Sequence, residues 1–325
     1  MLPRPHDEHR HLRSVQVILG TGSDMSKPFT FVDADPLEST RRFVATLSTS
    51  YHRYKLHTFT TDLEGPEDHH AYQALRHILG EILEMTAALA AAVIQATEVP
   101  HIWLILYKTR HLDSCISALR QEQPLPLSGV GGDLQQQTYA DLLDTMTDTY
   151  PELRDALSAG GQGIFKAYLD DAMKAEYNAL KHSNRVNPAS IQGRTTVGDM
   201  DWQRTMIFEQ LHKIETQGLT GHVLQWSVHP VELTTLYAQI DLCLRWLDVL
   251  HWALRRLHGV DTATPHPGFP PLEDVTKVWA SGEAVMVVTQ ELTSRGRLLE
   301  DGRRRTAVPL SEDDSLPHGI TRREI

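Results

Sequence analysis

The chain has 325 residues, 41% hydrophobic content and a formal net charge of -11. This composition supports a full buried core and excludes a chain that is disordered throughout. The negative charge argues against nonspecific DNA binding, because phosphate contacts need clustered lysine and arginine. The two cysteines, Cys115 and Cys243, lie in apolar helical patterns, which indicates buried thiols in a reducing compartment rather than a disulfide framework.

The N-terminal region begins with MLPRPHDEHRHLRS, which lacks the apolar segment of a signal peptide, so we expect a cytoplasmic protein. Residues 1–36 then carry two β-rich runs, SVQVIL and FTFVDA, which predict a β-hairpin. The GTG between these runs is not expected to bind a nucleotide. A dinucleotide fingerprint needs three spaced glycines that lead into a helix, and here a second strand follows.

Residues 37–258 are predicted to form a helical-bundle domain. Helical periodicity indicates helices at about 37–54, 67–97, 101–122, 136–158, 160–185 and 230–258. The most apolar window, which begins at Met85, is interrupted by polar residues and by Pro100. It therefore predicts two soluble helices that meet at Pro100, with no membrane span. Between 189 and 228 the periodicity changes, and we expect a strand-rich insert with a hairpin around TQGLTG.

The C-terminal part is predicted to contain little helix. Residues 259–294 comprise a linker, DTATPHPGFPP, and a hairpin in which TKVWAS and EAVMVVTQEL flank a turn. Residues 295–325 are charged and poor in apolar side chains, which predicts a disordered tail. The whole chain is therefore expected to be α+β, mainly α. It is predicted to be a helical bundle with short β-hairpins at the N-terminus, near 190–228 and near 275–293.

The stretch that points to chemistry is GGQGIFKAYLDDAMKAEYNALKHSNR, residues 160–185. It predicts one amphipathic helix that begins after Gly160 and Gly161 and ends before Pro188. Its polar flank consists of side chains at spacings of three and four, namely Asp171, Lys174, Asn178, His182 and Arg185. The helix dipole favours a cation in the last turn, so one interpretation is a basic helix cap formed by Lys181, His182 and Arg185.

A second interpretation comes from the string Tyr177-Asn178-Ala179-Leu180-Lys181-His182. It resembles a degenerate form of the motif of HEPN domains, which are helical bundles. Active members carry an arginine, a polar residue and then a histidine, and these residues of two protomers meet at a dimer interface and cleave RNA without a metal. The resemblance implies RNA and a second copy of the chain as partners, and a stress-linked or antiviral defence role.

The resemblance also assigns roles to individual residues. His182 would be the catalytic acid/base residue, Asn178 would orient it, and Lys181 would be the third catalytic residue. Arg185 and Lys174 would bind phosphate, and Lys181 or Arg185 would contact the reacting phosphate. The arginine position is occupied by a tyrosine, which cannot supply a fixed positive charge to a pentavalent phosphate. RNase activity therefore requires Lys181 or Arg185 to substitute for the arginine. A noncatalytic interaction or dimerisation module of the same architecture is the alternative.

A third alternative is a metal-binding helical-bundle enzyme, which the 18 histidines suggest. The best-placed candidates are His70, His77 and Glu81 on one helix, and His251 and His258 on another. One Glu-x-x-His run, Glu67 to His70, stands at the start of the first helix, but the second run that a bundle metal site needs from a facing helix is absent from residues 230–258, and His-Glu-x-x-His does not occur. We therefore predict no metal and no cofactor. Walker loops, CxxC pairs, Gly-x-Ser-x-Gly elbows and kinase signatures do not occur in the sequence either.

Overall fold

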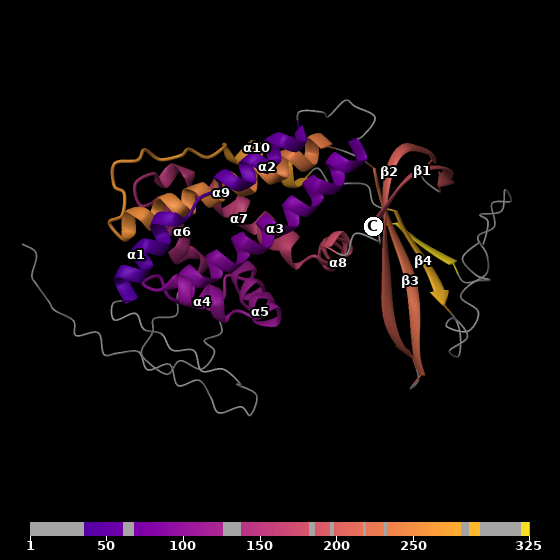
Figure 1. The fold of residues 1–325 in the computed structure, drawn as a ribbon, viewed down its shortest axis with the longest axis horizontal. Coiled ribbons are helices and arrows are strands. Elements are labelled where there is room, and N and C mark those ends of the chain that lie inside the picture. Colours follow the sequence, from indigo (N-terminus) through magenta and orange to yellow (C-terminus); the bar gives the residue numbers. More distant parts are fainter. Residues whose placement is uncertain are drawn as a thin grey trace, which may run out of the picture.

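A computed structural model gives the fold of the chain (Figure 1). The structure describes residues 36–60, 68–125, 138–181, 186–195, 198–216, 219–230, 233–280, 286–292 and 320–324. The helices are α1 (Pro36–Thr46), α2 (Ser50–Thr60), α3 (Asp68–Gln95), α4 (Pro100–Leu106), α5 (Thr109–Arg120), α6 (Tyr139–Thr147), a short 3-10 helix (Pro151–Leu153), α7 (Arg154–Leu169), α8 (Asp171–Lys181), α9 (Leu233–Leu257) and α10 (Leu272–Ala280). The strands are β1 (Val186–Thr195), β2 (Gly198–Thr216), β3 (Leu219–Pro230), β4 (Met286–Leu292) and β5 (Ile320–Glu324). The hairpin predicted within residues 1–36 falls almost entirely outside the described residues.

The main body is a helical bundle built around α3 and α9, which confirms that the fold is mainly α. Both helices were predicted close to their observed bounds, because each has a long and unbroken apolar periodicity. In the described part of the chain, α3 alone is long and apolar enough to cross a membrane, and 72% of its most apolar window is buried within the protein. That burial is typical of the core helix of a soluble bundle. The predicted boundary at Pro100 is confirmed, since α4 begins there.

Three predicted helices are each divided by a turn. The helix expected at 37–54 is interrupted between α1 and α2, where the Ser48 hydroxyl accepts the backbone N–H of Ser50 and so caps α2. The helix expected at 101–122 is interrupted by extended backbone at Tyr107 and Lys108. The helix expected at 136–158 ends before Pro151, whose ring keeps the preceding residue out of the helical region.

The prediction of one helix over residues 160–185 is wrong. The backbone is extended at Asp170, and its carboxylate accepts the N–H groups of Ala172 and Met173, which caps a separate helix α8. Gly160 and Gly161 do not precede the helix but lie inside α7. They allow aromatic side chains to approach the helix backbone closely, and a Cβ at Gly161 would overlap the Tyr139 hydroxyl.

The strands form one antiparallel sheet in the order β1-β2-β3-β4-β5, which lies beside one end of the helical body (Figure 1). The pair β2 and β3 corresponds to the strand-rich insert expected between 189 and 228. Phe208 of β2 is fully buried in the same core cluster as the helices, so it attaches the sheet to the body.

Two C-terminal predictions are corrected. The TKVWA run belongs to helix α10 rather than to a hairpin strand. The apolar residues of this helix, Val275, Val278 and Trp279, pack against α7 and α9 at helical spacing. Residues 320–324, within the segment expected to be disordered, pair with β4 as strand β5. Pairing with a neighbouring strand satisfies backbone groups irrespective of side-chain composition, which a prediction from composition does not include.

Candidate functional site

Tyr177, which the resemblance aligns with the arginine of the motif, is a packing residue of the contact between α8 and α3. A Cβ at Gly80 of α3 would overlap the Tyr177 ring, so the ring lies directly on the helix backbone there. The ring centroid is 5.4 Å from that of His77, also on α3. Burial raises the pKa of Tyr177 to about 12, and the carboxylates of Glu84 and Glu81 add to this rise. The side chain is therefore a neutral hydroxyl at physiological pH.

A positive charge lies beside this ring although the tyrosine carries none. The Lys181 ammonium is 3.9 Å from the Tyr177 ring centroid and 3.8 Å from Oε2 of Glu84. Both partners of this ion pair are about half exposed, at 41% for the lysine and 51% for the glutamate side chain. Asn178 lies on the same helix and is exposed. Lys181 and Asn178 are thus both accessible at the C-terminal end of α8.

Lys174 is oriented differently from Lys181. Its ammonium lies 2.9 Å from Oδ1 of Asp113 on α5 and 5.1 Å from the ring centroid of Tyr168 on α7. The structure therefore separates Lys174 from the lysine at the other end of α8. The two remaining predicted site residues, His182 and Arg185, lie outside the described residues.

Glu81 of α3 gathers three basic side chains next to the α8 contact. Lys55 of α2 donates a hydrogen bond to its Oε2, Nε2 of His52 lies 4.0 Å from the same oxygen, and Nδ1 of His77 lies 3.6 Å from Oε1. Burial lowers the pKa of His52, the Lys55 charge lowers it further, and Glu81 opposes both effects. Nδ1 of His52 is buried, with no hydrogen-bond partner within the described part of the protein.

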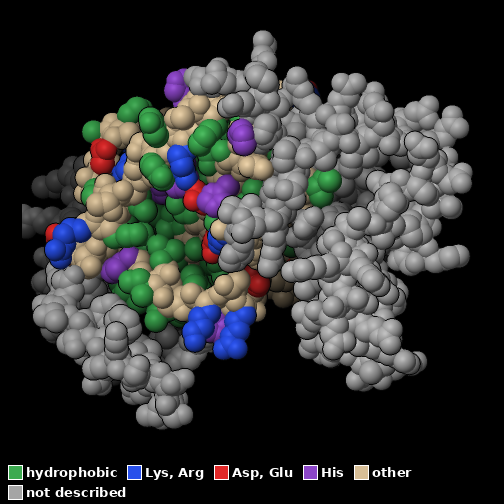
Figure 2. Space-filling view, turned by 45° about the vertical axis from the view of Figure 1, so that its right-hand side comes forward, with side chains coloured by type: hydrophobic (Ala, Val, Ile, Leu, Met, Phe, Trp, Pro, Cys, Tyr) green, Lys and Arg blue, Asp and Glu red, His purple; other side chains and the backbone are tan. Residues whose placement is uncertain are grey.

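These contacts form a continuous line of side chains across three helices, which we call the polar strip. It consists of Tyr51 and Lys55 on α2, His77 and Glu81 on α3, and Tyr177 and Lys181 on α8. Figure 2 brings the α8 side of the body forward, and there histidine and charged side chains border a hollow lined by apolar side chains. The α3 and α8 members were predicted from sequence patterns, but both α2 members were missed. They are far from α8 along the chain, and no spacing pattern links them to it.

The histidines considered as metal ligands have other surroundings. His251 is buried on α9, and burial lowers its pKa to about 4. Nε2 of His258 lies 3.0 Å from the carbonyl oxygen of Thr97. His70 is exposed near the start of α3. Over the described ranges, no group of three or more histidine, cysteine, aspartate or glutamate side chains could hold a metal ion.

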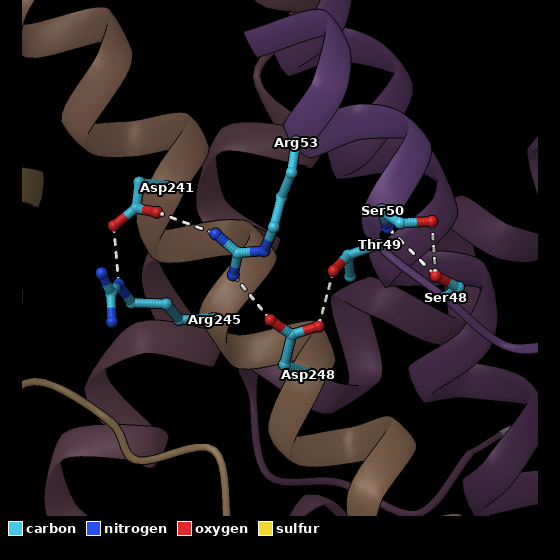
Figure 3. Close-up of polar contacts among 7 residues, drawn as sticks. All are labelled: Ser48, Thr49, Ser50, Arg53, Asp241, Arg245 and Asp248. Carbon is cyan, nitrogen blue, oxygen red and sulfur yellow. Dashed lines mark hydrogen bonds and ion pairs between the residues drawn. The ribbon is translucent and has the colours of Figure 1, made fainter. Parts of the chain in front are cut away.

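A second polar network fixes the other side of α2 to α9 (Figure 3). The Arg53 guanidinium donates to Oδ1 of Asp241 at 3.2 Å and to Oδ2 of Asp248 at 2.6 Å. The Thr49 hydroxyl donates to the other oxygen of Asp248 at 2.6 Å, and Arg245 donates to Asp241 at 2.6 Å. We call these five residues the Arg53 network. Charge-assisted hydrogen bonds of this kind restrict the orientation of both helices.

Comparisons with known proteins give no relative. The chain matches no protein-family model, no curated protein and no solved structure. The resemblance to HEPN domains therefore stays a prediction, based on the motif residues alone.

Proposed function

We propose that the chain is a cytoplasmic RNA-directed protein with its site at the C-terminal end of α8. One observation carries this proposal: the Lys181 ammonium lies beside the Tyr177 ring, where the HEPN motif has its arginine. Lys181 would supply the cation that the tyrosine lacks. Its ion pair with Glu84 is half exposed, and such pairs contribute only about 0–1 kcal/mol. An RNA phosphate can therefore replace Glu84 at small cost.

The neighbouring residues suit the roles that the resemblance assigns. His182 follows Lys181 directly in the sequence, and a histidine can exchange a proton near neutral pH. Asn178 is exposed one turn earlier and would orient the histidine or the substrate. Arg185 would contact a second phosphate. Lys174 has its charge directed to Asp113, so it would contribute less to phosphate binding than Lys181.

Cleavage of total RNA in EDTA tests the proposal, because the predicted chemistry needs no metal. We expect the full-length protein to cleave RNA and His182→Ala to lose this activity, since acid/base residues typically contribute about 100-fold or more. Lys181→Ala should also reduce cleavage strongly, whereas Lys181→Arg should retain part of it. Lys166→Ala is the matched control, because this exposed lysine lies in the last turn of the neighbouring helix α7.

Two results would contradict an RNase. Cleavage that persists in His182→Ala would assign the activity to another residue or to a contaminant. If the RNA stays intact with the wild type and with every variant, the protein either binds RNA without cleaving it or has no RNA function. A direct measurement of RNA binding separates these two cases.

A noncatalytic interaction or dimerisation module is the second candidate. It is favoured by the close packing of Tyr177 on Gly80, which gives the tyrosine a structural reason to be present. On this reading α8 joins the bundle to the sheet and performs no chemistry. Intact RNA with all variants, no RNA binding, and a dimer in analytical ultracentrifugation would support it.

A further inference from the structure

We infer that the outer face of α2 binds single-stranded RNA by stacking bases on Tyr51 and Tyr54. This inference rests on the proposed function and extends it, because it names the form of RNA and the element that holds it. The RNA would run from α2 across α3 to the end of α8, along the polar strip. None of these α2 residues belongs to the motif that suggested RNA.

The first observation is the exposure of two neighbouring aromatic rings. Tyr51 is 64% and Tyr54 is 69% exposed, and their spacing of three places them on one face of α2. Two adjacent exposed rings on one helix face offer flat apolar surface on which a ligand can stack.

The second observation is the chemistry between the rings. Helix α2, SYHRYKLHTFT, carries an arginine, a lysine and two histidines and has no acidic residue. The Lys55 ammonium lies 4.7 Å from the centroid of the Tyr51 ring. Aromatic rings interleaved with basic side chains are typical of surfaces that bind single-stranded nucleic acid, because every unpaired base offers a flat face for stacking.

The charges of α2 also predict how such RNA would be held. Lys55 is paired with Glu81, and Arg53 is paired with Asp241 and Asp248, so these cations are largely neutralised. Stacking rather than phosphate neutralisation would then supply most of the binding free energy on α2. Binding should therefore depend less steeply on salt concentration than binding to a strongly basic groove.

The third observation is that α2 is fixed on both flanks. The Arg53 network holds one side to α9 (Figure 3), and Lys55 holds the other side to α3 through Glu81. A base that stacks on Tyr51 or Tyr54 would meet a ring whose helix is already oriented. Less conformational entropy is then lost on binding than with a mobile segment.

The polar strip joins α2 to the proposed site without a break. From Tyr51 the side-chain contacts pass through Lys55 and Glu81 to His77, whose ring is 5.4 Å from that of Tyr177. A strand held on α2 would thus be directed towards Lys181. This supports one RNA-binding surface with a stacking end and a phosphate-binding end.

Fluorescence anisotropy with a labelled 12-nucleotide oligouridylate and a matching blunt RNA duplex tests the inference on the full-length protein. We expect Tyr51→Ala/Tyr54→Ala to weaken single-strand binding by about tenfold or more, in line with the usual contribution of base stacking on aromatic side chains. Tyr51→Phe/Tyr54→Phe keeps both rings and should bind within about twofold of wild type. The duplex should bind weakly to every variant. Both tyrosines are exposed, so thermal unfolding should change little in either double variant.

The outcomes separate this inference from the proposed function. Suppose that Tyr51→Ala/Tyr54→Ala binds single-stranded RNA as tightly as the wild type, whereas Lys181→Ala loses binding. This result would overturn the α2 inference but would still support the α8 proposal. No binding of either RNA by the wild type would overturn both. If the wild type instead self-associates, and Tyr51→Ala/Tyr54→Ala abolishes this, α2 is a protein interface and the RNA inference is wrong.

Discussion

The core around α7 and α9 and the polar strip use the same residue types in different surroundings. In each region a tyrosine packs closely on a helix glycine: Tyr139 packs on Gly161 in the core, and Tyr177 of the strip packs on Gly80. Each also contains histidine near carboxylate. In the core the Tyr139 hydroxyl is buried and donates to carbonyl oxygens of α7, and His251 is buried as well, whereas Tyr177, His77 and Glu81 in the strip are partly exposed. The difference indicates that the core groups fix the fold, and that the strip groups can exchange their partners for a ligand.

The largest expected effect is acid destabilisation by His251. Its pKa is about 4 in the folded protein, because burial disfavours the cation, against an ordinary value of 6.5 in the unfolded chain. The unfolded state therefore binds the proton first as the pH falls, and stability decreases between pH 6.5 and pH 4. The difference in pKa corresponds to a loss of up to about 3 kcal/mol. Asp248 and Arg255 act on this histidine in opposite directions.

Urea unfolding at a series of pH values measures this effect. His251→Gln should lose less stability than wild type across this pH range, because its side chain does not titrate. His111→Gln, which changes an exposed histidine, is the control and should follow the wild-type curve. If the free energy of unfolding falls equally with pH in all three proteins, His251 does not account for the acid sensitivity.

The second-largest expected effect is the loss of stability caused by a Cβ at Gly161, in the core. Gly161→Ala should cost about 2 kcal/mol, because its Cβ would overlap the Tyr139 hydroxyl, which is buried and donates to the carbonyl oxygens of Leu157 and Ser158. The hydroxyl cannot move without losing these bonds. Gly160→Ala should cost less, because its Cβ would lie 3.0 Å from the nearest atom, Cζ of Phe269.

Urea unfolding of the two glycine variants tests this ranking. Adding Tyr139→Phe to Gly161→Ala removes the overlapping oxygen and should restore part of the stability. Equal losses for the two glycine variants, or no recovery in the double variant, would mean that the hydroxyl is not the obstacle.

These glycines also show which parts of the fold could be predicted from the sequence. Helices α3 and α9 follow from apolar periodicity, because each of them presents a long apolar face to the core. Gly160 and Gly161 were interpreted as a helix start, because glycine has a low intrinsic helix propensity. Their actual role depends on tyrosine and phenylalanine rings from distant segments, and local sequence cannot predict that contact.

In the candidate site too, some residues could be predicted from local sequence and others depend on tertiary packing. Asn178 and Lys181 were predicted from a local motif, and both lie exposed or half exposed on α8. Lys55 and His52 were missed, because their approach to Glu81 depends on how α2 packs on α3. The turn at Asp170 was missed for a different reason. A single aspartate can continue a helix or cap the next one, and the choice depends on tertiary packing.

A Cβ at Gly80, beneath Tyr177 of the polar strip, should have a smaller effect on stability than one at Gly161. Gly80→Ala would push the Tyr177 ring away from α3, but this ring is only partly buried and can turn towards solvent. The alanine also gains helix propensity, so we expect a net loss below about 1 kcal/mol. The pKa of Tyr177 should fall from about 12 towards its ordinary value of 10, because burial is the main cause of the rise.

NMR titration of ¹³C-labelled tyrosine follows this pKa, with Tyr177→Phe to identify the resonance. A pKa that stays near 12 in Gly80→Ala would mean that the ring remains buried and that the helices separate instead. That result would make the contact between α3 and α8 as rigid as the core contact, and it would remove the contrast between the two regions.

The smallest expected effect concerns the ion pair of Lys181 and Glu84. With both side chains about half exposed, a double-mutant cycle with alanine at both positions should give a coupling below about 0.5 kcal/mol, further reduced by salt. The measurement is urea unfolding of the two single variants and the double variant. A weak coupling leaves the lysine free to exchange Glu84 for a phosphate, as the RNA proposal requires. A coupling above about 1 kcal/mol would instead make the pair a structural contact between α3 and α8. The basic residues of α8 would then serve packing, and the noncatalytic interaction module would become the better account of this helix.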